Sequence, residues 1–269
     1  MLTPRRRMRL LTTNRGRVEG ARIRRRWTRP PEWVEPQGAT VLFEESFASG
    51  AFTNWNSCQW TGRNDDCQLY DGVADYSAAV VAIDGRPDVA RFELRDGEAP
   101  PFGGDERTEI SGPGPNGGAD LITEPGDERW FAFDMKLDAS FPTPAGGGGL
   151  VWQLHPNAPD TSPPLCLNID ASGNLAISNN DVSGYLWTDL GPAVKGTWRR
   201  YVIHALFSDD DTVGFREMWI DGVQVEPKTF CKTMIPGDIY NYMKIGHYRD
   251  ALSTSTAILY FDNLKITAP

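Results

Sequence analysis

Thirteen short segments rich in Val, Ile, Phe, Tyr and Trp recur along this chain of 269 residues, separated by clusters of turn-forming residues. Almost none of them shows the 3.6-residue periodicity of an amphipathic helix, so they are predicted to be strands. The Asp221-Gly222 step between two of them is typical of a type I′ hairpin. The sequence therefore predicts an all-β protein, built as a two-sheet antiparallel jelly roll or a related sandwich. The predicted strands are 39–47, 78–83, 90–95, 107–111, 129–137, 149–155, 164–169, 175–179, 198–207, 214–220, 223–227, 242–248 and 257–266.

Charge divides the chain into two unequal parts. Residues 1–30 contain eleven arginines and one acid, Glu19, whereas the rest carries 16 basic and 35 acidic side chains, a net charge of −19. We therefore expect a basic N-terminal arm over 1–38 and a β-domain over 39–269. The arm is predicted to dock onto other proteins of a larger assembly. Aromatic residues are too sparse among the arginines to indicate nucleic-acid binding.

Neither a secretory signal nor a membrane span is visible in the sequence. The N-terminus lacks the apolar core of about 7–15 residues that an export signal contains. No segment approaches the roughly 18 apolar residues of a membrane-spanning helix. The sequence predicts a protein without membrane contact.

Four cysteines leave the redox state open. Cys58 and Cys67 are the most plausible local pair, and free buried thiols are the equally weighted alternative for all four, Cys166 and Cys231 included. No two cysteines have the close spacing of a metal site. We expect no cofactor. No acidic loop has a recognisable Ca²⁺ ligand spacing, so the sequence does not support a structural Ca²⁺ but leaves it open.

Three of the predicted strands carry polar side chains at alternate positions, which places them on one face of each strand. A strand buried on both faces would avoid such residues. The polar faces are Arg107, Glu109 and Ser111 in 107–111; Gln153 and His155 in 149–155; and Tyr242, Lys244, Gly246 and Tyr248 in 242–248.

Together these side chains suit the removal of a proton next to a carboxylate. Taking the C5 proton of a uronate places negative charge on its carboxyl group, and donors such as Arg107 and Gln153 would stabilise that charge. A base must then accept the proton, and an acid must protonate the departing glycosidic oxygen. His155 and Tyr248 are the candidates for these two roles.

The motifs "RTEIS", "QLH" and "YMKIGHYR", in this order, resemble the three motifs of the jelly-roll polysaccharide lyases, which have a concanavalin A-like sandwich fold. Within that class they are most similar to the heparin-lyase-I-like and glucuronan-lyase-like group and to the related alginate lyases. The resemblance implies that Arg107 and Gln153 neutralise the substrate carboxylate, that His155 is the base for one C5 epimer, and that Tyr248 is the acid and for some substrates also the base. It further implies that Lys244 lines the cleft and binds substrate. Tyr242, Glu109 and Arg249 are predicted to bind substrate as well, with a purely structural Arg107–Glu109 ion pair as the alternative.

A tyrosine that acts as base needs a pKa well below its usual value of about 10. Neighbouring cations such as Lys244 and Arg107 are expected to lower the pKa of Tyr248. The motifs also depart from the alginate-lyase pattern, with Ser111 in place of a second arginine and Asp250 in place of a glutamine. These departures favour the heparin-lyase-like and glucuronan-lyase-like branch and leave the substrate open. Because a domain of net charge −19 repels a dense polyanion, heparin is disfavoured relative to a uronate polymer with about one charge per sugar.

Two other functions compete with the lyase. A glycoside hydrolase needs two carboxyl groups flanking the scissile bond, but Glu106 and Glu109 are three residues apart and face opposite sides of a strand. A non-catalytic carbohydrate-binding or adhesion module is the stronger alternative, because jelly rolls host both functions. In such a module Trp55, Trp60 and Trp187 could stack on sugars.

Two further expectations concern mobility and location. The segment 142–150, "PTPAGGGGL", is expected to be either a slack surface loop or a mobile lid beside a cleft. His204 and His247 are expected to be structural. A polysaccharide lyase works outside cells, and the sequence lacks an export signal. The prediction is therefore a bacteriophage tail protein, attached to other virion proteins through residues 1–38 and facing a host envelope or capsule, or an otherwise extracellular enzyme.

Overall fold

The computed structural model describes residues 36–65, 67, 76–112, 122–158, 161–181 and 184–269. Every regular element in this part of the chain is a β-strand, and the strands form two antiparallel sheets. The all-β prediction is therefore confirmed. No helix in the described ranges is long and apolar enough to span a membrane. The predicted basic arm lies almost wholly outside the described residues.

The first sheet has eight strands, with β1 pairing at the side of β17. Its centre is formed by β8 and β17, which pair from Leu259 opposite Leu137 to Thr267 opposite Trp130. In sheet order the strands are β15 (Val223–Phe230), β14 (Phe215–Ile220), β13 (Arg199–Leu206), β8 (Glu128–Leu137), β17 (Ala257–Ala268), β5 (Arg86–Leu94) and β4 (Ala78–Ile83), together with β1 (Thr40–Glu45).

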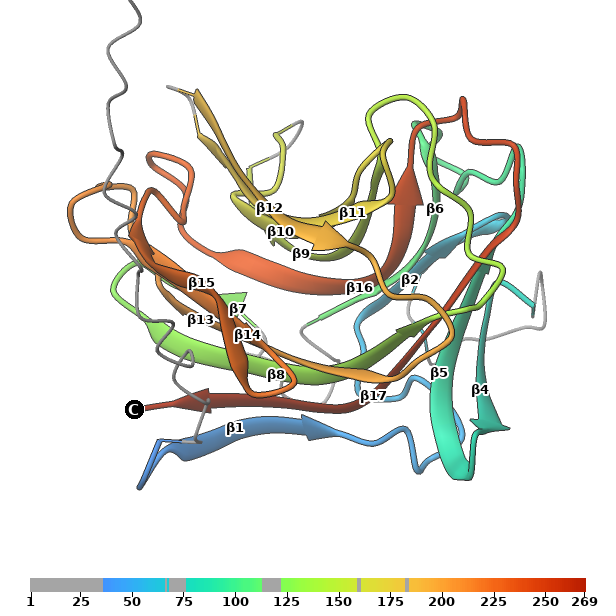
Figure 1. Ribbon diagram of the computed structural model, residues 1–269, viewed down its shortest axis with the longest axis horizontal. Helices are drawn as coiled ribbons and strands as arrows, with labels where there is room; N and C mark the ends of the chain where they lie inside the picture. The colour runs from blue at the N-terminus through green and yellow to red at the C-terminus, as the bar shows by residue number, and fades with distance from the viewer. Residues whose placement is uncertain (1–35, 66, 68–75, 113–121, 159–160, 182–183) are drawn as a thin grey trace, which may run out of the picture. The chain divides into compact units, whose positions relative to one another are not determined.

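The second sheet has nine strands and carries the three polar motifs on adjacent strands. Figure 1 shows that it curves, with β9 and β16 along the bottom of the curve and β6 and β12 rising on either side. In sheet order the strands are β12 (Gly184–Pro192), β11 (Asn174–Asp181), β10 (Leu165–Ile169), β9 (Gly149–Pro156), β16 (Asn241–Arg249), β6 (Glu106–Ser111), β2 (Ser57–Trp60) and β3 (Arg63–Asp65), together with β7 (Ile122–Thr123), which pairs with β16.

The core lies between the two sheets and is built from alternate residues of each strand. In β16, Met243 and Ile245 are fully buried in this core, as is Trp152 of β9. Trp152 meets Phe131 and Phe133 of the opposite sheet, with ring centroids 5.5 and 6.2 Å apart. Since one face of β16 is held by the core, its polar face must point outwards on the concave side of the second sheet.

All thirteen predicted segments coincide with strands of the structure. Four strands were not predicted, β2, β3, β7 and β12, because they are very short or contain Gly, Pro and acidic residues. The predicted hairpin is confirmed, since Asp221 and Gly222 have φ values of 50° and 78°. A disulfide joins Cys58 to Cys67, whereas Cys166 and Cys231 are free and buried.

Candidate active site

The three polar faces predicted from the sequence form a single surface. Strand β16 lies between β6 and β9, and the predicted residues stand opposite one another in register. Directly opposite residues of an antiparallel pair share a face and have neighbouring side chains. The opposed pairs are Tyr248 with Arg107, Gly246 with Glu109, Lys244 with Gln153, and Tyr242 with His155.

An irregularity in β16 sets the position of Tyr248. The register with β9 shifts between Ile245 and Tyr248, so that Tyr248 stands opposite Leu150. At this point Gly246 has a φ of 131°, a conformation that residues with a side chain rarely adopt. Bulges of this kind re-aim a side chain and often lie beside active sites.

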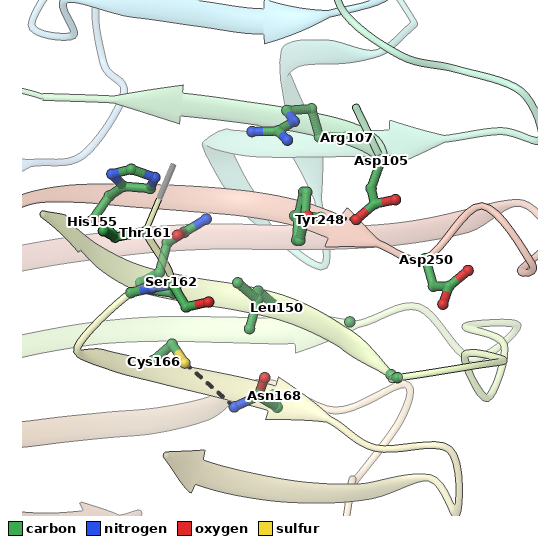
Figure 2. Close-up of a pocket in the computed structure, with 15 residues that line it drawn as sticks. Asp105, Arg107, Leu150, His155, Thr161, Ser162, Cys166, Asn168, Tyr248 and Asp250 are labelled. Carbon is green, nitrogen blue, oxygen red and sulfur yellow. Dashed lines mark hydrogen bonds between the residues drawn. The ribbon is translucent and has the colours of Figure 1, made fainter. Parts of the chain in front are cut away.

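Arg107, Gln153, His155 and Tyr248 line one cavity of about 500 Å³. Figure 2 shows Arg107, His155 and Tyr248 together with other lining residues from β9, β10 and the adjoining loops. The structure therefore brings together all four residues predicted to be catalytic. The other residues that line the cavity are Asp105, Gly147, Gly148, Gly149, Leu150, Thr161, Ser162, Pro163, Cys166, Asn168 and Asp250.

A buried carboxylate, Glu109, contacts the cationic and amide side chains at one part of this cavity. Glu109 accepts a hydrogen bond from Gln153 Nε2 at 2.5 Å, and its other oxygen lies 3.8 Å from Arg107 and 3.9 Å from Lys244. Lys244 also donates to Gln59 Oε1 at 3.0 Å. Glu109 and Lys244 are each only 2% exposed. These two residues, which the sequence suggested as substrate contacts, are not among the residues that line the cavity. Glu109 contacts Arg107 and Gln153 directly, and Lys244 contacts Glu109.

His155 has one nitrogen available for proton transfer. Its Nδ1 lies 2.8 Å from the Pro156 carbonyl oxygen. Because a carbonyl only accepts, Nδ1 carries the hydrogen and Nε2 keeps a free lone pair. Burial, and then the charge of Lys244, lower the pKa of His155 below its ordinary value. His155 is therefore neutral at neutral pH and can accept a proton. The ring of Tyr242 packs beside it, with centroids 5.2 Å apart.

The surroundings of Tyr248 favour its protonated form. Its hydroxyl donates to Asp105 Oδ2 at 2.6 Å, while the Arg107 guanidinium lies 4.4 Å from the centroid of its ring. Burial and then the hydrogen bond to Asp105 raise the pKa of Tyr248 to about 12, outweighing the opposite effect of Arg107. The expectation of a lowered pKa was wrong, because it counted the nearby cations and missed Asp105.

Arg249, suggested from the sequence as a substrate contact, does not reach the cavity. It is 1% exposed and donates to Glu106 Oε2 at 2.8 Å. Its position in β16 has the parity of Met243 and Ile245, so its side chain leaves the other face of the strand. The prediction for Arg249 was wrong for this reason.

Two of the tryptophans suggested as sugar-stacking residues are also in the core. Trp55 and Trp60 are fully buried, whereas Trp187 is partly exposed on β12. The two histidines expected to be structural are both buried. His204 lies 2.8 Å from Glu128 and from Glu217, and His247 Nδ1 lies 3.0 Å from the Leu150 carbonyl oxygen.

Two glycines of the segment 142–150, Gly148 and Gly149, are packed into the wall of the cavity, whereas Gly147 lines it from an exposed position. Gly148 and Gly149 are buried, and Gly148 has a φ of 90°. A side-chain carbon at Gly148 would lie 2.6 Å from the Ile169 carbonyl oxygen, and one at Gly149 would lie 2.5 Å from His247 Cε1. These glycines allow close packing of the cavity wall.

Asp105 is the main site residue that sequence reasoning missed. It precedes the "RTEIS" motif by two residues. Its role depends on Tyr248, 143 residues further along the chain. Alternation with Arg107 and Glu109 places Asp105 on their side of the chain. Its partner could not be read from the sequence, because only the pairing of β6 with β16 brings the two residues together.

The arrangement suits charge neutralisation and proton transfer by side chains. Arg107 and Gln153 offer donors at one part of the cavity, His155 offers a lone pair and Tyr248 offers a proton. Among the described residues, no group of three or more His, Cys, Asp or Glu side chains could hold a metal ion.

Comparison with known proteins identifies the family. The model of the polysaccharide lyase family matches residues 47–265. The chain belongs to the polysaccharide lyase family. It is an enzyme of this class, and the family match includes all three polar motifs. No curated protein shows significant similarity to the chain.

Solved lyase structures share the fold of this polysaccharide lyase. It is similar to an endo-β-1,4-glucuronan lyase from the fungus Trichoderma reesei, with 15% identity and a TM-score of 0.63 over 86% of this chain and 96% of that one. It is also similar to the alginate lyase AlyA1 from Zobellia galactanivorans, with 14% identity and a TM-score of 0.56 over 84% and 100% of the chains. The alginate lyase PA1167 from Pseudomonas aeruginosa is similar as well, with 15% identity and a TM-score of 0.55 over 79% of this chain and 98% of that one. The predicted jelly-roll sandwich is confirmed.

Proposed function

We propose that this polysaccharide lyase cleaves a uronic-acid-containing polysaccharide by β-elimination. The observation that carries the proposal is the convergence of Arg107, Gln153, His155 and Tyr248 on one cavity. Solved structures with the same fold include a glucuronan lyase and alginate lyases, both named for uronate polymers. A binding module would have no need of a neutral histidine and a protonated tyrosine on either side of an arginine.

In the proposed reaction the substrate carboxylate lies against Arg107 and the remaining N–H of Gln153. Their donors stabilise the negative charge that develops on the carboxylate as C5 loses its proton. We propose that these side chains supply this stabilisation without a cofactor. Lys244 and Tyr242 support the site from below and beside it.

The bonds then change in a balanced way. The lone pair of His155 Nε2 takes the C5 proton, and the electrons of the C5–H bond form the C4–C5 double bond. The C4–O bond breaks, and the Tyr248 hydroxyl gives its proton to the departing glycosidic oxygen. The products are a chain with an unsaturated uronate end and a chain with a free hydroxyl. Transfer of one proton from His155 back to Tyr248 through solvent restores the enzyme.

The direct test is to incubate the protein with alginate, glucuronan, hyaluronan and heparin-type polymers and to follow the ultraviolet absorbance of unsaturated uronate ends. We expect product from at least one uronate polymer. Tyr248→Phe and His155→Ala should each lower kcat by about 10²–10⁴-fold while the circular dichroism spectrum stays unchanged. Binding without absorbance for every polymer would favour a carbohydrate-binding or adhesion module instead.

We further propose a location at a host cell envelope or capsule, as part of a bacteriophage tail. The support is the strongly basic composition of residues 1–30, which suits attachment to acidic surfaces of other virion proteins. Deleting residues 1–38 should prevent incorporation into the particle while leaving the lyase domain active. Normal assembly of the deleted protein would overturn this proposal.

A further inference from the structure

Asp105 ends the loop that leads into β6 and meets the proposed catalytic acid. The loop turns sharply at Gly103 and Gly104, which have φ values of 80° and 88°. Asp105 then places its exposed carboxylate 2.6 Å from the Tyr248 hydroxyl. Figure 2 shows the two side chains next to each other at one side of the cavity.

The proposed base and acid reach the cavity from different places. His155 comes from β9 and stands opposite Tyr242, whereas Tyr248 lies six residues further along β16. Figure 2 shows His155 and Tyr248 well apart across the cavity. A substrate between them would therefore meet the base on one side and the acid on the other.

The separation matters because elimination has two stereochemical forms. In glucuronate and mannuronate the C5 hydrogen and the C4 oxygen lie on the same face of the ring, so a single residue can act as base and then as acid. In their C5 epimers, iduronate and guluronate, the two groups lie on opposite faces. The second form needs a base and an acid on opposite sides of the sugar, each in the correct protonation state before reaction.

We propose that Asp105 is a positioning residue that holds Tyr248 as a proton donor, which restricts this lyase to uronates whose C5 hydrogen and C4 oxygen lie on opposite ring faces. This inference rests on the proposed function of the same site. A tyrosine bound to a carboxylate is a poor base, because losing its proton would place two negative charges side by side.

Other charged groups around Tyr248 do not replace Asp105. Arg107 packs on the tyrosine ring and favours its ionised form, while Glu109 disfavours that form from beneath the cavity. Asp250 lines the same cavity beyond the end of β16. Of these groups, only Asp105 is hydrogen-bonded to the hydroxyl in the described part of the structure.

The test compares the protein with Asp105→Asn on polyguluronate, polymannuronate and glucuronan, followed by the absorbance of unsaturated ends. An asparagine keeps an oxygen that can accept a hydrogen bond from the Tyr248 hydroxyl and removes the negative charge. We expect the unchanged protein to cleave polyguluronate at least about tenfold faster than the other two polymers, because each unit by which the pKa of Tyr248 is raised lowers the fraction of ionised tyrosine, the base that same-face elimination needs, about tenfold. In Asp105→Asn the alkaline limb of the pH profile should move to lower pH, and activity on the same-face polymers should rise relative to polyguluronate.

The matched control is Asp96→Asn, an exposed aspartate in the same loop. It should leave both the pH profile and the polymer ratio unchanged. Faster cleavage of polymannuronate or glucuronan by the unchanged protein would overturn the inference while supporting the lyase function. The inference would also be overturned if Asp105→Asn had the same pH profile and the same ratio of activities on the polymers as the unchanged protein. Absence of unsaturated product from every uronate polymer would instead remove the proposed function, and this inference with it.

Discussion

Gly246 of β16 lies so close to Thr108 of β6 that no side chain fits between the two strands. A side-chain carbon on Gly246 would overlap the Thr108 carbonyl oxygen and lie 2.8 Å from Glu109 Cα. This close contact occurs within the irregularity that brings Tyr248 over the cavity. The glycine thus links the packing of two strands to the position of the proposed acid.

Replacing Gly246 with alanine should therefore destabilise the fold and abolish activity together. The clash involves backbone atoms that cannot move without breaking the β6–β16 ladder, so we expect a loss of at least about 2 kcal/mol in the free energy of unfolding. Urea denaturation measures this loss. Gly147→Ala is the control, because a side-chain carbon there meets nothing within 4 Å and should change stability by less than about 1 kcal/mol. Equal stabilities of the two variants would contradict the prediction.

Removing the charge of Glu109 should lower both stability and activity, because this buried carboxylate contacts Arg107, Gln153 and Lys244. Glu109→Gln leaves Lys244 buried without its carboxylate partner, and breaking a buried ion pair typically costs about 3 kcal/mol or more. Activity should fall with stability, because Arg107 loses a negatively charged partner and the hydrogen bond from Gln153 loses its ionised acceptor.

The matched control for Glu109→Gln is Glu44→Gln on β1. Glu44 pairs with Lys265 at 3.4 Å, but its side chain is 64% exposed. An exposed pair contributes less than about 1 kcal/mol, so this variant should be nearly neutral in urea denaturation. A Glu109→Gln protein as stable as Glu44→Gln would show that the buried cluster is not a support.

The fall of kcat/KM at low pH, the acid limb of the profile, should reflect the protonation of His155. Only the neutral imidazole can accept the C5 proton, so kcat/KM should fall as pH drops through the pKa of His155. That pKa is lowered by burial and by Lys244, so the limb should lie below pH 6.5, the ordinary value for histidine. Initial rates measured over a series of pH values, at saturating and at limiting polymer concentration, locate this limb. An acid limb above pH 6.5 would mean that another group is the base.

The stability of the fold should fall in mild acid because of His247. Burial lowers the pKa of His247 to about 4, whereas the unfolded chain has the ordinary value of 6.5. Between these values the unfolded state binds more protons, so stability is complete above pH 6.5 and is lost as pH falls towards 4. The full effect corresponds to about 3 kcal/mol.

Urea denaturation across this pH range, with His247→Leu for comparison, tests the assignment. The variant loses the contact with the Leu150 carbonyl and should be less stable overall. Its stability should nevertheless depend less on pH between 6.5 and 4 than that of the unchanged protein. The same pH dependence in both proteins would assign the effect to other groups.

Local patterns were sufficient for the fold and for most of the site. The alternation in 242–248 predicted that Met243 and Ile245 face one side of the strand and Tyr242 and Lys244 the other. In the structure the first two residues lie in the core, and the other two lie on the concave side. Strand periodicity is a property of neighbouring residues, so it is visible without knowledge of pairing. The same rule would have placed Arg249 on the core-side face.

Burial and long-range partners could not be obtained in this way. Lys244 and Glu109 have the correct face, but the structure shows them covered and paired beneath the surface. Trp55 and Trp60 were possible sugar contacts until their burial was known. Burial depends on which elements pack together, and the periodicity of a single strand does not contain that information.

The sequence by itself determined that the chain forms a jelly-roll sandwich with polar motifs on three strands, because side-chain alternation and turn residues are local properties. The tertiary structure alone decided how those motifs work together. It placed β6 and β9 on either side of β16 and brought Asp105 to Tyr248. The protonation state of Tyr248 follows from that contact, because a pKa depends on the charges and burial around the group.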